Sequence, residues 1–172
     1  EAGNLYEWLV RLVLLRSGIL RSEQKVVSIK SDKHLDVNGR LDFIGGGKPD
    51  WKQANDVVLQ LKDLCFPMRM MTIAEKLIDS LKQKYPEGMK ELLIEVKSVN
   101  SMVFWKHNKK EGEQPLMKAY PHHVLQAYTY MKALGFDEGR ILYISKDDLT
   151  LAEVRIVKDE KMIYQILFFI GF

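Results

Sequence analysis

The sequence predicts an α/β domain in which helices flank a mixed central β-sheet. Stretches with helical periodicity alternate with short runs rich in Val, Ile and Leu, the order expected when helices pack on a sheet. Of the 172 residues, 47% are hydrophobic and 28% are charged, a composition typical of soluble globular proteins. A chain of this length can bury one sizeable core, so we expect residues 1–172 to form a single domain.

The N-terminal part predicts a helix followed by a β-hairpin. Residues 3–20 are dense in Leu and Val, and Gly18 near their end is a typical helix stop, so a largely buried helix is expected there. Two β-prone runs follow. The Asn38-Gly39 pair between two apolar stretches predicts the turn of a hairpin, whose second strand then carries Asp42.

A pair of helices is expected in the next segment. From Trp51 to Tyr85 apolar residues recur at helical spacing in two stripes separated by Pro67, which indicates two amphipathic helices. We interpret residues 48–88 as a helical insertion between the strands on either side of it.

Strands and one more helix complete the chain. Residues 91–97 alternate so that Glu95 and Lys97 share a face, while apolar residues lie on both faces of the strand. A helix is expected from about Pro121 to Leu134, ended by the following glycine. Three closing strands are predicted at residues 140–145, 151–157 and 162–170.

Charge and cysteine content exclude several classes of protein. The single Cys65 excludes an intramolecular disulfide and any multi-cysteine zinc or iron–sulfur site built within one chain. A reducing compartment, and therefore the cytoplasm, is the expectation. The net charge of +3 is too mild to identify a partner, and no apolar run reaches the roughly 20 residues of a membrane span.

Three acidic residues are candidate metal ligands. If Asp42 and Glu95 lie on adjacent strands, their carboxylates could stand about 4 Å apart and repel by ~4 kcal/mol at an effective dielectric constant of 20. Such a pair needs a cation, and oxygen ligands suit Mg²⁺ or Mn²⁺. Glu7 faces the apolar stripe of the first helix, where an unpaired carboxylate is costly. The alternatives are structural: an ion pair of Glu95 with Lys97, an edge-strand Asp42, and a Glu7 stabilised by the helix dipole.

A polar stripe marks the helix near residue 126. His122, Gln126 and Tyr130 follow one another at intervals of one helical turn and share a face. Imidazole, amide and phenol groups in a row could bind a phosphate or orient a metal-bound water. The alternative is polar decoration of a helix that buries its other face.

The segment from Phe104 to His123 is basic and aromatic. With Trp105 and Tyr120 it offers rings for base stacking, and a solvated loop is the alternative. The lysines that would contact phosphates are Lys106, Lys109, Lys110 and Lys118.

Taken in order, these motifs resemble the PD-(D/E)XK nuclease superfamily, most closely its RecB-like and phage exonuclease branch. They are Glu7 on the opening helix, GRLD ending at Asp42, IEVKS with Glu95 and Lys97, and QAYTY with Gln126 and Tyr130. The resemblance covers about residues 3–146 without 48–88. Leu41 stands where many members have proline, and Asp42 and Glu95 are unusually far apart in sequence.

The resemblance implies a restriction-endonuclease-like core and a role for each motif residue. Asp42 and Glu95 would be metal ligands, together with the Val96 carbonyl and, directly or through water, Glu7. Lys97 would orient or deprotonate the attacking water. The scissile phosphate and the nucleophile would be positioned by Gln126 and Tyr130, and DNA would be bound by these two residues, by His122 and by the four lysines.

The function implied is that of a Mg²⁺- or Mn²⁺-dependent deoxyribonuclease that hydrolyses phosphodiester bonds. An exonuclease or DNA end-processing enzyme of phage, recombination or repair type is expected, in a bacterial, archaeal or phage-infected cell and without an iron–sulfur cluster. Three alternatives stay open. One is a structure-selective, junction-resolvase-like endonuclease whose inserted helices join two copies of the chain, another a non-cleaving DNA-binding module, and the third an α/β domain of other function.

Overall fold

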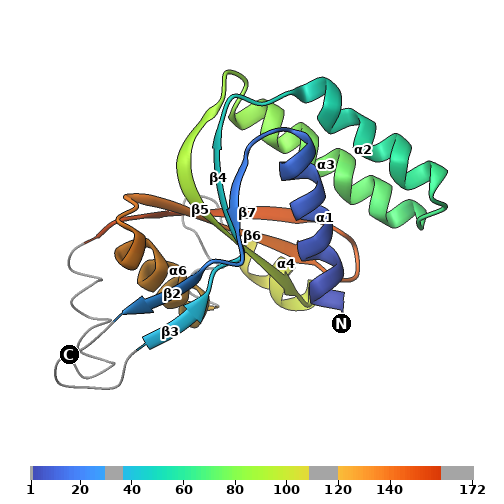
Figure 1. Ribbon diagram of the computed structural model, residues 1–172. Coiled ribbons are helices and arrows are strands. Elements are labelled where there is room, and N and C mark those ends of the chain that lie inside the picture. The colour runs from blue at the N-terminus through green and yellow to red at the C-terminus, as the bar shows by residue number, and fades with distance from the viewer. Residues whose placement is uncertain (1, 30–36, 109–119, 160–172) are drawn as a thin grey trace.

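The computed structural model describes residues 2–29, 37–108 and 120–159, and its centre is a five-stranded mixed sheet (Figure 1). The strand order is β1-β4-β5-β6-β7. Neighbouring strands are antiparallel except for β5 and β6, which run parallel. The strands span Leu20–Glu23 (β1), Phe43–Gly47 (β4), Met89–Val99 (β5), Glu138–Ser145 (β6) and Leu151–Val157 (β7).

Helices cover both faces of this sheet, which confirms the expected α/β class (Figure 1). One core joins three helices to the face of β5 that carries Leu92, Ile94 and Val96, and the other joins two helices to the opposite face. The first three are α1 (Ala2–Arg16), α2 (Trp51–Asp63) and α3 (Met68–Lys84); the other two are α4 (Ser101–Asn108) and α6 (Pro121–Leu134).

Strand β5 is buried on both faces of the sheet. Because successive side chains of a strand point to opposite faces, alternate residues of β5 pack against different helices. Leu93 and Val99 belong to the core under α6, so Glu95 and Lys97, which alternate with them, face the same way. The partition of the strand predicted from residues 91–97 is confirmed. α6 also ends as predicted, at Gly135 in the left-handed conformation (φ 75°).

The predicted helical pair connects two neighbouring strands, since β4 and β5 are hydrogen-bonded partners. Asp50 caps α2 by accepting hydrogen bonds from the backbone N–H groups of Lys52 and Gln53. The buried sides of α2 and α3 join the same core as α1. Residues 48–88 therefore extend the layer on one face of the sheet and leave the α6 face open to other elements.

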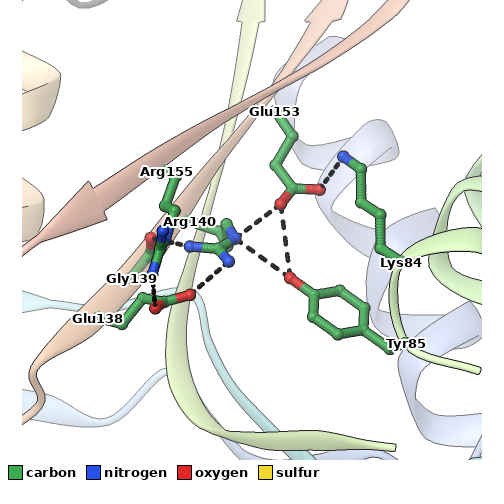
Figure 2. Close-up of polar contacts among 7 residues, drawn as sticks. All are labelled: Lys84, Tyr85, Glu138, Gly139, Arg140, Glu153 and Arg155. Carbon is green, nitrogen blue, oxygen red and sulfur yellow. Dashed lines mark hydrogen bonds and ion pairs between the residues drawn. The ribbon is translucent and has the colours of Figure 1, made fainter. Parts of the chain in front are cut away.

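An ion-pair network attaches the end of α3 to the last two strands (Figure 2). Arg140, with a side chain only 13% exposed, pairs with Glu138 and with Glu153 and donates a hydrogen bond from Nε to the hydroxyl of Tyr85 (3.1 Å). Glu153 also pairs with Lys84. These partners satisfy the charge of a largely buried guanidinium, as burial requires.

The hairpin expected with its turn at Asn38-Gly39 is wrong, and a different hairpin forms in this region. Strand β2 (Val26–Ile29) pairs antiparallel with β3 (Val37–Arg40), and Asn38 and Gly39 lie within β3, opposite Ser28 and Val27. Pairing along the whole of β3 outweighs the local turn preference of the dipeptide. The connection between the two strands falls in residues 30–36, outside the described residues.

Other predicted boundaries also need correction. The first helix ends at Arg16, and Leu20 already begins β1, because Gly18 at φ 73° turns the chain back to pair with β4. Residues 101–108 are helical, so the start of the segment from Phe104 to His123 is not the solvated loop given as the alternative. Asp42 lies at a bend between β3 and β4 and not on a strand. The strand predicted at 162–170 lies outside the described residues.

Within the described ranges, the helices are all too short or too polar to cross a membrane.

Candidate active site

Asp42, at the bend directly before β4, lies next to Glu95 on the neighbouring strand β5. The register pairs Phe43 with Ile94, which brings the residue before β4 next to Glu95. The backbone N–H of Asp42 donates to Oε1 of Glu95 (3.2 Å), and the N–H of Val96 donates to Oδ2 of Asp42 (2.8 Å). The two acidic residues predicted from sequence are thus neighbours, each held by the backbone of the other's element.

Burial sets the electrostatics of this pair. Glu95 is 0% exposed, and burial, followed by the negative charge of Asp42, raises the pKa of its carboxyl to about 7. The pKa of Asp42 is also raised, mainly by burial. Nζ of Lys97 contacts Oε2 of Glu95 at 3.1 Å and offsets part of this effect. Two adjacent carboxylates are therefore held where ionising both is unfavourable without a further positive charge.

Glu7 on α1 approaches the same site through Gln24. The side-chain amide of Gln24 donates to Oε1 of Glu7 (3.4 Å), and its backbone N–H donates to the carbonyl of Asp42 (2.9 Å). The charge of Glu7 is close enough to raise the pKa of Asp42. Gln24 was not predicted, and nothing in its polar sequence surroundings distinguishes it.

The polar stripe of α6 joins the site from the other side. Nε2 of Gln126 donates to the hydroxyl of Tyr130 (3.0 Å), which in turn donates to the carbonyl of Arg40 (3.3 Å), two residues before Asp42. The ring of Tyr130 is buried. His122 lies at the exposed start of the same helix, where its ring contacts Tyr120 and His123 instead.

His123 is a second residue that the sequence did not single out. Its Nδ1 lies 3.2 Å from the hydroxyl of Tyr143, and Tyr143 is the partner of Lys97 across the β5–β6 pair. Burial, followed by the charges of His122 and Lys97, lowers the pKa of His123 to about 4. Its position directly after His122 was a signal, but two adjacent histidines on a helix point in different directions and argue poorly for a metal site.

The donor set fits a hard divalent cation. The carboxylates of the half-buried Asp42 and the buried Glu95 are neighbours, the backbone N–H of Val96 donates to Asp42, and Glu7 is nearby. In the part of the chain that the structure describes, no group of three or more His, Cys, Asp or Glu side chains is placed to hold a metal ion. Carboxylate oxygens are ligands of the type that Mg²⁺ takes, usually one or two of them together with several waters.

The predicted phosphate-binding lysines are only partly located. Lys106 belongs to α4, which follows β5 almost directly. Lys109, Lys110 and Lys118 lie outside the described residues.

Comparison with known proteins gives no family for this chain. No family model matches it, and no curated protein matches it. A solved structure described only as that of SSO0001 resembles it with a TM-score of 0.46 and 15% sequence identity. The match covers 96% of this chain and 55% of the other, so the chain spans about half the length of that structure.

Proposed function

We propose that this protein is a metal-dependent DNA nuclease of the PD-(D/E)XK superfamily, of the RecB-like and phage exonuclease branch. The observation that carries the proposal is the pair formed by the half-buried Asp42 and the buried Glu95, with Lys97 in contact with Glu95. An ordinary ion pair does not explain it, because one lysine faces two carboxylates whose pKa values are both raised.

Convergence of the motifs supports the same proposal. Glu7, Asp42, the pair Glu95 and Lys97, and the pair Gln126 and Tyr130 come from four separated parts of the sequence. Hydrogen bonds or electrostatic effects connect the acidic residues with one another, and Tyr130 reaches the chain just before Asp42. Unlike the network around Arg140, in which each buried charge has a partner of opposite sign, this group places several acidic residues around one lysine.

The arrangement of these side chains supports a mechanism for hydrolysis of a phosphodiester bond. Asp42, Glu95 and the Val96 carbonyl would hold Mg²⁺ or Mn²⁺, which when bound lowers the pKa of water and neutralises charge that develops on the phosphate. Lys97 stands beside Glu95 and would orient the attacking water as an ammonium group, or accept its proton after giving up its own. The second N–H of the Gln126 amide would donate to the phosphate, and Tyr130, whose hydroxyl accepts from the first N–H and donates to the Arg40 carbonyl, would hold that amide in position. The water oxygen bonds to phosphorus and the P–O bond to one sugar oxygen breaks. The proton from the water leaves through Lys97 or solvent, and the departing sugar oxygen takes up a proton from solvent.

The expected substrate is a DNA end, and the expected compartment is the cytoplasm of a bacterial, archaeal or phage-infected cell. The lone cysteine supports a reducing compartment and argues against an iron–sulfur cluster within the chain. A second copy of the chain is a further proposed partner, because one domain of this size is too small to encircle DNA and an oligomer can do so.

One assay tests the proposal. Four substrates are used: linear DNA, nicked DNA, covalently closed DNA and a branched DNA junction. Each is incubated with Mg²⁺, Mn²⁺, Ca²⁺ or EDTA. Wild type is compared with Asp42→Asn and Lys97→Ala. Matched controls are Asp56→Asn, an exposed aspartate on α2, and Lys90→Ala, an exposed lysine on β5 itself.

We expect linear DNA to be degraded in Mg²⁺ or Mn²⁺, and both site variants, but neither control, to lose activity. Cleavage of closed circles or junctions would replace the exonuclease with an endonuclease. Metal-independent binding without cleavage would indicate the non-cleaving module. Full activity in Lys97→Ala would contradict the mechanism.

A further inference from the structure

Four aromatic rings are gathered where α6 begins. Tyr120 stacks on His123 with ring centroids 5.0 Å apart and on Tyr143 at 5.8 Å, with interplanar angles of 17° and 26°. The ring of His122 meets that of His123 edge-on at 4.2 Å. The cluster formed by Tyr120, His122, His123 and Tyr143 is called the ring cluster below.

The ring cluster adjoins the proposed active site. Tyr143 on β6 is the partner of Lys97 on β5, and residues paired across parallel strands point to the same face. Tyr143 lies in the core under α6, on the face to which Glu95 and Lys97 also point. The positive charge of Lys97 acts on His123. One side chain therefore separates the rings from the buried carboxylates.

Exposure rises across the ring cluster. Tyr143 is 0% exposed, Tyr120 and His123 are half-buried, and His122 is exposed. The inner ring is fixed by its hydrogen bond with His123, and Pro121 starts the helix that carries the outer ones. The result is a firmly supported aromatic surface that reaches solvent beside Lys97.

Resting on the function proposed above, we propose that Tyr120 and His122 form a stacking subsite for a DNA base next to the scissile phosphate. Aromatic side chains bind successive bases of a single strand through their faces, and this contact tolerates any sequence. In a duplex the faces of each base are already covered by its neighbours. The substrate strand is therefore unpaired at the site, either as a single strand or as a frayed end.

The test measures binding without cleavage, in EDTA. Fluorescence anisotropy compares an oligothymidylate of about 12 nucleotides with an abasic strand of the same number of phosphates and a duplex of the same length. Variants are Tyr120→Ala, Tyr120→Phe and His122→Ala, with Lys132→Ala, an exposed residue near the other end of α6, as control. Thermal unfolding of each variant checks that it folds.

We expect wild type to bind oligothymidylate most tightly. Tyr120→Ala and His122→Ala should each weaken that affinity by about 5- to 100-fold and leave the abasic strand unaffected, whereas Tyr120→Phe and Lys132→Ala retain the preference. Because His122 is exposed, its variant remains informative if Tyr120→Ala does not fold.

Equal affinity for oligothymidylate and the abasic strand would overturn the subsite, as would an equal loss for both strands in His122→Ala. A protein that cleaves linear DNA but shows no base preference loses only the subsite. If the protein binds oligothymidylate more tightly than the abasic strand, and Tyr120→Ala and His122→Ala weaken this preference, but no DNA is cleaved, then the base-binding site stands and the nuclease proposal is overturned.

Discussion

Gly39 on β3 lies directly against the ring of Tyr130 on α6. A Cβ at residue 39 would stand 2.5 Å from both Cε1 and the hydroxyl oxygen of that ring. Real Cβ atoms do not approach so closely, so this contact exists only because residue 39 is glycine. The contact packs the β2–β3 hairpin against α6, the helix that carries Gln126. The same tyrosine donates to the carbonyl of Arg40, two residues before Asp42.

Substitution of Gly39 should therefore act through Tyr130. We expect Gly39→Ala to destabilise the protein by about 1–3 kcal/mol, because the buried ring must move. Urea denaturation measures this cost in wild type and in a Tyr130→Ala background, where the clash is absent. The cost should largely disappear there; an equal cost in both backgrounds would show that the ring is not the cause.

The stability of the metal-free protein should fall as pH rises through the range where Glu95 ionises. Its folded pKa of about 7 lies above the unfolded value near 4.5, so the folded state binds more protons between these values. In EDTA, Glu95→Gln should thus be more stable than wild type at pH 8, by about 1–3 kcal/mol, and this gain should shrink toward pH 5. Glu91→Gln, an exposed substitution on the same strand, is the control, and urea denaturation at each pH is the measurement. A gain that does not vary with pH would refute the assignment.

Divalent cations should stabilise the fold without any substrate. A ligand at a hundred times its Kd adds about 2.7 kcal/mol, which for a chain of this size raises the Tm by about 5–10 °C. We expect Mn²⁺ to produce this shift in wild type and in Asp56→Asn but not in Asp42→Asn, as measured by calorimetry. The same shift in all three proteins would place the cation elsewhere.

Arg140 and Arg155 share the partner Glu138 but should differ in importance (Figure 2). Arg140 is 13% exposed and also pairs with Glu153, whereas Arg155 is 58% exposed. Arg140→Met should cost about 2–4 kcal/mol because it leaves carboxylates unpaired, and Arg155→Met at most about 1 kcal/mol. Chemical denaturation of the two variants provides the comparison. Similar costs would mean that burial does not control this network.

Sequence-based prediction was most accurate where apolar and polar residues alternate regularly along a helix or strand. The alternation of residues 91–97 placed Glu95 and Lys97 together on the α6 face, and the two apolar stripes located α2 and α3. Boundaries that depend on a distant partner were predicted wrongly. Asn38-Gly39 has the composition of a turn, yet its pairing with β2 and its contact with Tyr130 make it part of a strand.

By itself the sequence determined the α/β class, the residues of the acidic, lysine and Gln-Tyr motifs, and the two faces of residues 91–97, because these follow from residue type and local spacing. Only the tertiary structure decided that Asp42 meets Glu95 from a bend, that Gln24 links Glu7 to this pair, and that His123 and Tyr143 stand beside Lys97. Those relations depend on strand pairing between residues distant in the chain. The raised pKa values depend on burial, which only the packed core provides.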